Sequence, residues 1–381
     1  MLTDEQTFIL YCLQKSLKQK TEQAETVPAD ADYVLNALKR GGILLTVYDV
    51  LPDFYRQKLK ELYSTMIRQA VLQNYEGEQV LQALSSEGLD CIALKGWELR
   101  RLYPKMTMRQ MADLDILVRP YEYQRIRSIM ENLGALGEEE SSWKHDSFIK
   151  DGVHFELHKR LTDDSDRIQT WEGRMWSRAI RLRDHVYEMS PEDYYVFHFV
   201  HLHKDFMNGS LGLRRIADTW LLQKQKVDRS AVRAILDEFG LLTFHDRMVK
   251  LSLVAMGEAE IDENCEIMLK HAFTHGIYGS DISYKAGRIA KMGKSMRTGK
   301  IRSAFAAAFL PPQRMKAQFP VLKKWPVLLP LCWGKRIVRL LHDNVKENGA
   351  RLDYSKISDA DYREMKLFFE AGGTAPRSEK E

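Results

Sequence analysis

The sequence predicts an α+β fold, in which a small mixed β-sheet core is flanked by an N-terminal helical region and a large C-terminal helical region. Two observations indicate this class. Residues 86–165 contain short apolar runs separated by turn signals, a pattern typical of strands. Before and after this range, apolar residues recur at helical spacing. We therefore expect helices over residues 1–85, an α/β core over 86–165, a helical domain over 166–371 and a disordered tail over 372–381.

The N-terminal region carries clear helix signals. Thr3 and Gln6 match a capping box, in which each side chain bonds the backbone of the other residue. Farther along, apolar residues keep a helical period up to Leu84, with Gly77 as a weak point and Gly88 as the stop. This spacing predicts that a helix leads into the core.

Four strands are expected in the core. Residues 89–94 and 111–118 are apolar runs, and each is followed by a helix, the second one opened by Pro120. Residues 148–149 and 153–157 are two further strands, joined by an Asp-Gly turn, which is a strong hairpin signal. This order predicts helices laid on a mixed sheet.

After the core the chain is expected to be almost entirely helical. The basic stretch 279–318 is interpreted as a mobile loop, and 325–341 either as an interfacial segment or as a buried C-terminal helix. No stretch is long and apolar enough to span a bilayer. Helical spacing or caps mark residues 191–208, 212–224, 230–239, 244–256 and 262–272.

The overall composition limits the class of protein. The chain has 381 residues and a net charge of +4, which is small for this size and argues against a dedicated nucleic-acid coat protein. Its four cysteines are scattered without a C-x-x-C pair, which points to a reducing compartment and against a zinc finger. Asp4 and Glu5 stand where a secretory signal peptide would be basic, so we expect a cytoplasmic protein.

Asp113 and Asp115 are two acids inside an apolar run. If residues 116–118 form a buried strand, both carboxylates point to one face, because strand side chains alternate. Two carboxylates side by side repel each other unless a cation lies between them, and a divalent metal such as Mg²⁺ usually resolves this. An ordinary turn or strand start is the alternative for such a pair taken alone.

Glu156 is a third acid, within an expected strand. A carboxylate in mid-strand between apolar residues is unusual unless it is paired or binds a ligand. On a neighbouring strand it would complete a cup of three carboxylates with Asp113 and Asp115. Such a cup suits two Mg²⁺ ions about 3.5–4 Å apart, the arrangement used for in-line phosphoryl displacement.

Lys95-Gly96 ends the first expected strand and opens a helix. Gly96 lets a phosphate approach the backbone, and the first amides of the helix face it with the positive end of the helix dipole. Lys95 adds a point charge, and Arg109, just before the acid strand, is a second phosphate candidate. Taken singly, Lys95 and Arg109 are also ordinary surface residues.

These segments together resemble a known family. Residues 89–96, 102–104, 109–118 and 155–158 are similar, in order and spacing, to the uncharacterised bacterial nucleotidyltransferase family of the DNA polymerase β-like nucleotidyltransferase superfamily. The resemblance is specific over about residues 60–165 and looser through the helical C-terminal region.

The resemblance implies a palm-like sheet and transfer of a nucleoside monophosphate from an NTP, with ATP as the expected donor, to an acceptor hydroxyl with release of pyrophosphate. It implies Asp113, Asp115 and Glu156 as catalytic residues that bind two Mg²⁺ ions, with Mn²⁺ as the alternative ion. The acceptor could be a sugar, a small metabolite, a peptide or a protein. The superfamily usually has Gly-Ser where this chain has Lys95-Gly96, so Lys95 and the helix amides are expected to hold the terminal phosphates.

Three further side chains are candidates near the acids. The resemblance places Arg214 against the sheet as a phosphate ligand, whereas Arg214 and Asp218 are also spaced for an ordinary i,i+4 ion pair. His158 is interpreted as a residue that orients Glu156, as a proton acceptor near the acceptor hydroxyl, or as a packed residue at the strand end.

Three histidines lie close together in the helix after Pro191. His198 and His201 share a face, and His203 follows. They are interpreted as an active-site lid that contacts nucleotide or acceptor, as a zinc site that lacks a convincing fourth ligand, or as structural histidines on a half-buried helix.

The main hypothesis is therefore a Mg²⁺-dependent nucleotidyltransferase. A catalytically silent nucleotide-binding module, with a regulatory or interaction role, is one alternative. A kinase-like phosphotransferase that uses the same metals is the other, and it would release NDP instead of pyrophosphate. The sequence carries no strong nucleic-acid signal.

Overall fold

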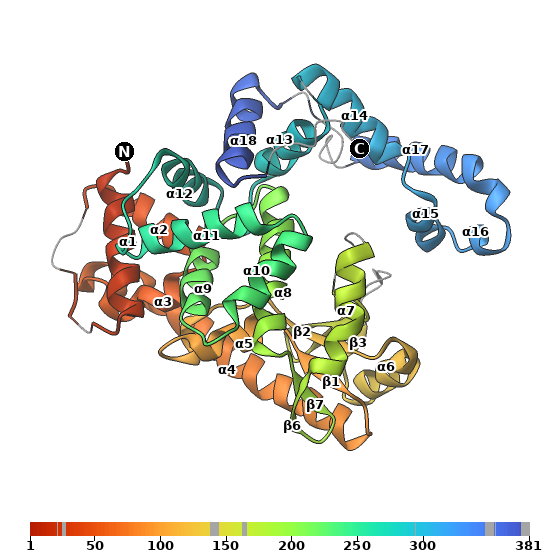
Figure 1. The fold of residues 1–381 in the computed structure, drawn as a ribbon, viewed down its shortest axis with the longest axis horizontal. Coiled ribbons are helices and arrows are strands. Elements are labelled where there is room, and N and C mark those ends of the chain that lie inside the picture. The colour runs from red at the N-terminus through yellow and green to blue at the C-terminus, as the bar shows by residue number, and fades with distance from the viewer. Residues whose placement is uncertain are drawn as a thin grey trace.

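The structure, a computed structural model, has the predicted α+β fold, with one mixed sheet and helical regions before and after it in the sequence (Figure 1). The predicted domain boundaries stay a prediction, and residues 375–381 of the predicted tail lie outside the described residues. The structure describes residues 1–374 except 21, 25–27, 138–144, 162–165, 294, 347–353 and 355.

The N-terminal region is helical, and its helices begin where the sequence signals them. Thr3 and Gln6 form the predicted capping box, since the side chain of each accepts a hydrogen bond from the amide of the other. The last helix continues through Gly77 and ends just before Gly88, whose φ is positive. The helices are α1 (Asp4–Leu17), α2 (Ala31–Arg40), α3 (Leu44–Val47) and α4 (Asp53–Ser86).

Gly77 is required for packing between α4 and the short helix α5 (Gly96–Leu99). A Cβ atom at position 77 would lie 1.9 Å from a ring carbon of Trp97. The predicted weak point of α4 is therefore a contact site, and it ties the long helix to the Lys95-Gly96 segment.

All four predicted strands are present in a seven-stranded sheet with the order β3-β4-β5-β2-β1-β7-β6. The predicted hairpin joins β4 to β5, and its turn residues Asp151 and Gly152 both have positive φ, as a tight hairpin turn needs. The strands are β1 (Cys91–Ala93), β2 (Asp113–Val118), β3 (Leu136–Gly137), β4 (His145–Lys150), β5 (Val153–His158), β6 (Ile180–Arg183) and β7 (Val186–Glu188).

Side chains of β2 alternate between two layers. Leu114, Ile116 and Val118 pack into a core with α4 and with α6 (Tyr123–Asn132). Leu117 joins the larger helical core on the opposite face. Because strand side chains alternate, Asp113 and Asp115 point to this second face, where the C-terminal helices lie.

The hairpin of β6 and β7 was not predicted from the sequence. β6 alternates Ile180 and Leu182 with two arginines, but it has only four residues, all of them exposed, and β7 has only three residues. β7 pairs in parallel with β1 through Cys91 and Val186. The sheet thus includes strands from beyond residue 165.

The C-terminal region is helical as expected, and Figure 1 shows α8 and α9 above the sheet. It opens with α7 (Asp166–Arg178) before the last two strands. The helices that match the predicted segments are α8 (Pro191–Met207), α9 (Leu213–Gln223), α10 (Arg229–Glu238), α11 (Leu242–Ala255) and α12 (Glu263–His275).

The prediction of a mobile loop over 279–318 is wrong. This stretch forms α13 (Asp281–Met292), α14 (Met296–Ala308) and α15 (Pro312–Gln318). Ser280 and Ser295 begin the first two helices with capping boxes, so these two residues mark helix starts, while Gly287 and Gly299 lie inside α13 and α14.

Residues 325–341 do not form a buried helix. They include a 3-10 turn and the first part of α17 (Leu329–Lys346), where Leu331 and Val338 are exposed. Within the described residues, no helix is both long and apolar enough to cross a membrane. The last helix of the described residues is α18 (Asp359–Ala371), which packs against α12 and α13.

Candidate functional site

A cavity of about 310 Å³ opens at the acid end of β2, between the sheet and helices α8 and α9. Its wall is acidic on the sheet side and basic on the helix side. Of the candidate residues from the sequence, His198, His203 and Asp218 are absent from its lining. The lining consists of Lys95, Gly96, Arg109, Met111, Ala112, Asp113, Asp115, His145, Glu156, His158, Leu161, His201, Lys204, Arg214, Arg215 and Tyr278.

Strand pairing brings the three predicted acids together. β2 and β5 run parallel, with Asp113 opposite His154 and Asp115 opposite Glu156. Residues directly opposite each other on neighbouring strands have their side chains on the same face. Asp113, Asp115 and Glu156 therefore share the cavity face of the sheet, as the sequence predicted.

Two buried side chains hold the backbone that leads into β2. Thr46 Oγ1 donates to the carbonyl of Met108 at 2.8 Å, and Gln73 Nε2 donates to the carbonyl of Met111 at 3.2 Å. These donors come from α3 and α4. The N-terminal helices thus fix where the acid strand begins.

Asp115 lies at the centre of a polar network. Its Oδ1 accepts a hydrogen bond from Lys95 Nζ at 2.6 Å and lies 2.6 Å from His158 Nε2. The same His158 nitrogen lies 3.1 Å from Glu156 Oε2. Burial opposes the ionisation of Asp115, but Lys95 and His158 hold its pKa well below the usual range.

At the end of the sheet that carries the three acids, acidic side chains outnumber the basic ones that contact them. Burial and the neighbouring charge of Asp115 raise the pKa of Asp113 above its ordinary value. The hydrogen bond from His158 instead lowers the pKa of Glu156. Three carboxylates thus face Lys95 and His158, and a further cation would stabilise the group.

Lys95 has an unusual backbone conformation. Its φ is +43° and its ψ is −110°, a combination that costs a non-glycine residue about 1–3 kcal/mol. The hydroxyl of Tyr194 on α8 donates to the Lys95 carbonyl at 2.7 Å and holds this peptide. Strain of this kind clusters at functional sites, and here it directs the Lys95 side chain to Asp115.

Helix α5, which begins at Gly96, is only four residues long before it becomes a 3-10 turn. A helix of this length contributes little dipole, so the expected phosphate contact of its amides stays a prediction. A Cβ atom at position 96 would lie 2.6 Å from Arg109 Nη1. Gly96 therefore leaves space for the Arg109 guanidinium.

Arg109 is held in the cavity wall by Asp218 on α9. Its Nε and Nη2 each donate to a different carboxylate oxygen of Asp218 at 2.8 Å, and Tyr103 Oη donates to Asp218 at 2.8 Å. Burial opposes the charge of Asp218, but Arg109 lowers its pKa. The Arg109 phosphate role stays a prediction, and Asp218 pairs with Arg109 and Tyr103.

The helix side of the cavity is basic. Arg214 is buried at the start of α9 and donates from Nη1 to the carbonyl of Gln110. Arg215 bonds Asp205 on α8, and Lys204 lies exposed at the cavity edge. These groups face the three acids across the cavity.

The three histidines of α8 have separate environments. His198 Nε2 lies 3.0 Å from Thr219 Oγ1, and His203 packs edge-on against Phe244. His201 lines the cavity, with Nδ1 3.2 Å from Asp205. The three do not form a joint zinc site within the described residues, and a role for His201 at the cavity stays a prediction.

Four lining residues with polar side chains were missed from the sequence. Lys204 and Arg215 each adjoin a residue that the sequence did single out, so their helical neighbourhood was the available signal. His145 pairs with His158 across β4 and β5. Tyr278 comes from a loop more than a hundred residues after the acids, and no local pattern places it there.

Comparison with known proteins decides the family. A sequence model of the uncharacterised nucleotidyltransferase family matches residues 27–253. The chain belongs to this family. The matched range contains the whole sheet of this nucleotidyltransferase and every predicted site residue.

One solved structure is similar to this nucleotidyltransferase. The solution structure of the antibiotic-resistance factor ANT(2'')-Ia is similar at 13% sequence identity and a TM-score of 0.34, over 46% of this chain and 92% of that chain. A comparison with curated proteins finds no match.

Proposed function

We propose that this chain transfers a nucleoside monophosphate from an NTP to an acceptor hydroxyl, with Mg²⁺ as its metal. Family membership supports nucleotidyl transfer. The observation that carries the finer proposal is the cavity itself, where three strand-borne carboxylates face a wall of basic side chains. A cavity with carboxylates on one side and basic side chains on the other suits a metal-bound triphosphate.

The residues present fit a pair of divalent ions. Asp113, Asp115 and Glu156 offer hard oxygen donors on one face, and their excess negative charge is what Mg²⁺ or Mn²⁺ would offset. These three residues would hold the ions. When bound, the ions would stabilise negative charge on the phosphates and on the attacking oxygen.

Basic side chains would hold the triphosphate. Lys95 is fixed by its strained backbone, and Arg214 and Arg215 present positive charge from α9. Lys204, exposed at the cavity edge, would meet the terminal phosphates as they enter. Positioned cations of this kind stabilise charge that develops on a leaving pyrophosphate.

In the proposed reaction the acceptor oxygen forms a bond to the α-phosphorus. The bond from that phosphorus to the oxygen bridging to the β-phosphate breaks, and pyrophosphate leaves. Glu156, less buried than Asp115, is the carboxylate that would receive the acceptor proton. His158 contacts both Glu156 and Asp115, and these contacts fix the positions of the two carboxylates relative to each other.

A thermal-shift series with the four NTPs tests nucleotide binding. An NTP that binds only the folded state should stabilise the chain by about 2.7 kcal/mol at a hundredfold excess over Kd. We expect this shift with ATP and only when Mg²⁺ or Mn²⁺ is present. The absence of a shift with all four nucleotides and both metals would contradict the proposal.

Product analysis separates the proposal from its alternatives. Pyrophosphate, with the nucleoside monophosphate attached to an acceptor, is the expected product. NDP would instead support a kinase-like phosphotransferase on the same metals. Metal-dependent nucleotide binding without turnover over sugars, metabolites, peptides and proteins would support a silent binding module.

A further inference from the structure

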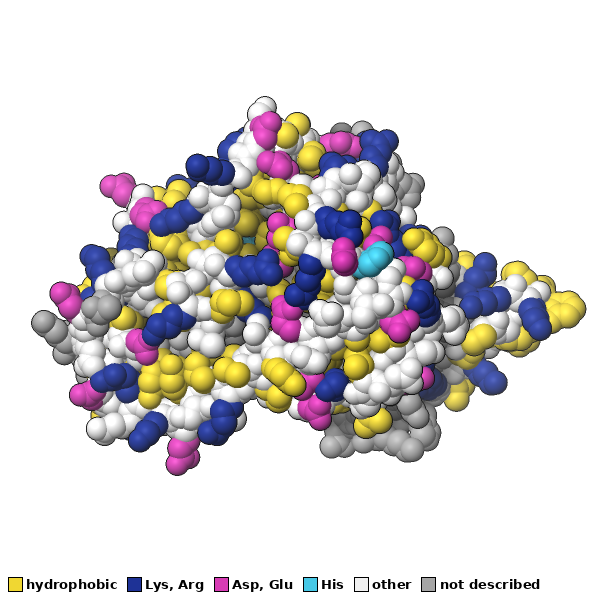
Figure 2. All heavy atoms as spheres, turned by 90° about the horizontal axis from the view of Figure 1, so that it is seen from below, with side chains coloured by type: hydrophobic (Ala, Val, Ile, Leu, Met, Phe, Trp, Pro, Cys, Tyr) yellow, Lys and Arg dark blue, Asp and Glu magenta, His cyan; other side chains and the backbone are white. Residues whose placement is uncertain are grey.

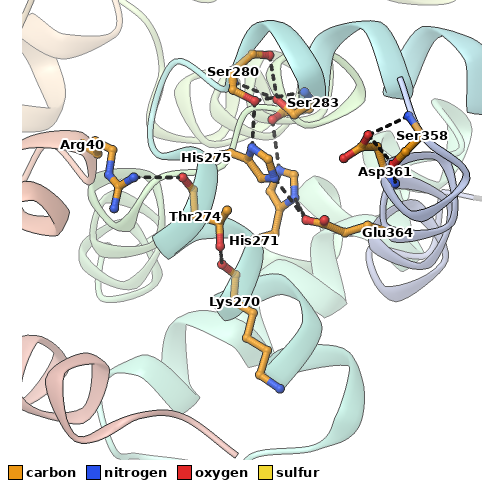
Figure 3. A network of polar contacts seen from close by, with 11 residues as sticks. Arg40, Lys270, His271, Thr274, His275, Ser280, Ser283, Ser358, Asp361 and Glu364 are labelled. Carbon is orange, nitrogen blue, oxygen red and sulfur yellow. Dashed lines mark hydrogen bonds and ion pairs between the residues drawn. The ribbon is translucent and has the colours of Figure 1, made fainter. Parts of the chain in front are cut away.

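Two histidines and a glutamate, none of which lines the cavity, converge toward the C-terminal end of α12. His271 and His275 lie one turn apart on α12, and Glu364 reaches them from α18 (Figure 3). His275 Nε2 lies 3.1 Å from Glu364 Oε1, and His271 Nδ1 lies 3.8 Å from the same oxygen. The three candidate ligand atoms lie within 4.8 Å of one another.

Both imidazoles are anchored through their outer nitrogen. His271 Nε2 lies 3.0 Å from the carbonyl of Gly209, to which it can only donate. His275 Nδ1 lies 2.8 Å from Ser280 Oγ. Ligand histidines in metal sites usually donate their other ring N–H to a backbone carbonyl, carboxylate or water, as His271 does to Gly209, and this bond turns the remaining nitrogen to the metal. Because Ser280 Oγ can donate or accept, its contact holds the His275 ring without fixing the tautomer.

The tautomer of His271 leaves a lone pair without a partner. Because Nε2 carries the proton, Nδ1 of neutral His271 has a lone pair, and among the described residues it has no hydrogen-bond donor. The side chain is only 1% exposed, so water does not compensate freely. A buried acceptor without a donor is costly, and a metal ion would satisfy it.

The distances suit a tetrahedral ion. With Zn–N and Zn–O bonds of about 2.0–2.2 Å, neighbouring ligand atoms of a tetrahedron are about 3.3–3.5 Å apart. The separations of 3.1 and 3.8 Å bracket this value. Glu364 is half exposed, so the site has an open side for entry of the ion and a water ligand.

We propose that His271, His275 and Glu364 form a zinc site that fastens α18 to α12. Two imidazoles and one carboxylate are ligands that zinc accepts, and the C-terminal end of α12 favours positive charge. The site lies outside the proposed catalytic cavity, so it would stabilise the C-terminal region rather than take part in nucleotidyl transfer.

Zinc retention by the full chain tests this site. Protein stripped with a chelator is loaded with zinc and desalted, and the metal per chain is counted. We expect Glu364→Gln and His275→Gln each to lose one equivalent relative to wild type. Glu370→Gln, on the same helix and similarly exposed, is the matched control, and Glu156→Gln reports on metal in the catalytic cavity.

Cobalt provides a readout that does not depend on counting. Cobalt in a four-coordinate site absorbs visible light strongly, and this band should be present in wild type, Glu370→Gln and Glu156→Gln but absent in Glu364→Gln. Equal zinc retention and equal spectra in wild type and Glu364→Gln would overturn the site. Loss of metal only in Glu156→Gln would also overturn it, since the ion would then belong to the cavity.

A second and independent feature is the arm formed by residues 296–346, which projects from the rest of the molecule (Figure 1). From residue 296 to residue 342, within the arm, the sequence has ten Lys and Arg and no Asp or Glu. The whole chain has a net charge of only +4, so its remaining residues carry more acids than bases. The positive charge is therefore concentrated on this part.

The end of the arm also exposes large apolar side chains. Trp325 is 62% exposed and Val327 is 78% exposed, at the turn between α16 (Val321–Lys324) and α17. Leu331 and Val338 on α17 are exposed as well. Figure 2 shows yellow and dark blue side chains side by side at this projecting end.

We also infer that the end of the arm binds the surface of an anionic phospholipid bilayer. Tryptophan and aliphatic side chains insert at the headgroup boundary, and nearby Lys and Arg side chains are attracted to anionic lipid. A face for nucleic acid would be polar, whereas this one combines charge with exposed Trp325 and Val327.

Vesicle flotation with the full chain tests this surface. We expect binding to vesicles of equal parts phosphatidylglycerol and phosphatidylcholine, weakened by salt, and none to phosphatidylcholine alone. The double change Trp325→Ser and Val327→Ser keeps the charge and should reduce binding at least tenfold. Tyr121→Ser, at an exposed aromatic elsewhere, is the control and should bind as wild type.

Two outcomes would overturn the lipid surface. One is the absence of flotation with anionic vesicles. The other is unchanged flotation of the Trp325 and Val327 variant. If vesicles fail and duplex DNA binds with a dependence on Lys323 and Lys324, the arm is a nucleic-acid surface instead.

Discussion

Asp115 and Glu156 lie directly opposite each other on the parallel strands β2 and β5, and one nitrogen of His158 contacts both carboxylates. Parallel pairing requires a crossover connection between the two strands, and here α6, β3 and β4 lie between them in the chain. The sheet thus brings together, on one face, charges that repel each other. Lys95 and His158 offset part of this repulsion, which is why we place the metal here.

Lys95→Met should reduce kcat about a hundredfold, because removing a positioned group that stabilises developing charge typically costs this much. The change also removes the cation that Asp115 contacts at 2.6 Å. Steady-state kinetics checks the effect, with Lys105→Met as the control, since Lys105 pairs with Asp49 on the surface. Equal kcat for wild type and Lys95→Met would exclude Lys95 from the chemistry.

Arg109→Met should destabilise the fold by about 3–5 kcal/mol, because it leaves Asp218 as a buried charge without its partner. Replacing both residues by apolar ones should restore part of that free energy of unfolding. Denaturant titration measures it. A variant with unchanged stability and lost activity would show instead that Arg109 acts mainly on phosphate.

Gly77→Ala should destabilise the protein by about 1–3 kcal/mol, since its Cβ would overlap the rigid Trp97 ring. Gly173→Ala is the matched control in helix α7, where a Cβ meets no atom within 4 Å. That control should stabilise the protein by about 0.5–1 kcal/mol through helix propensity. Thermal unfolding that ranks the two variants in the opposite order would contradict the packing.

His198 should make stability fall as pH decreases below about 6.5. Burial lowers the pKa of His198 to about 3, so it stays neutral in the folded chain, while the unfolded chain takes up a proton below about 6.5. The free energy of unfolding therefore falls by up to about 1.4 kcal/mol per pH unit between these values.

Denaturant titrations at pH 4 to 7 measure this slope. His198→Gln can keep a hydrogen bond to Thr219 but cannot titrate, so its slope should be shallower than that of wild type. Identical slopes would show that His198 is not buried in its neutral form.

Much of the fold could be predicted because its signals are local. The acid strand, the Asp-Gly hairpin and the capped helices each depend on a few neighbouring residues. β6 was missed although Ile180 and Leu182 alternate with arginines, because a run of four residues is a short signal within a region that was predicted to be helical. The basic stretch at 279–318 misled the prediction, because Gly and Ser mark helix ends as well as loops.

The site residues that lie on strands could be predicted from the sequence, whereas those that lie on helices were harder to place. Asp113 and Asp115 share a face through strand alternation, and Glu156 joins them through the parallel pairing of β2 with β5. The partnership of Arg109 with Asp218 depends on how α9 packs on the sheet, which no spacing in the sequence encodes. The same holds for Tyr278, which a distant loop places at the cavity.

The most direct test of the account is pyrophosphate release by Asp115→Asn. Asparagine keeps the size of the side chain but removes the charge that the metal and Lys95 require. In an assay with ATP, Mg²⁺ and an acceptor used by wild type, we predict that pyrophosphate release falls to the no-enzyme level while the unfolding temperature shows a folded chain. Wild-type release by a folded Asp115→Asn would contradict the assignment of the cavity as the nucleotidyl transfer site.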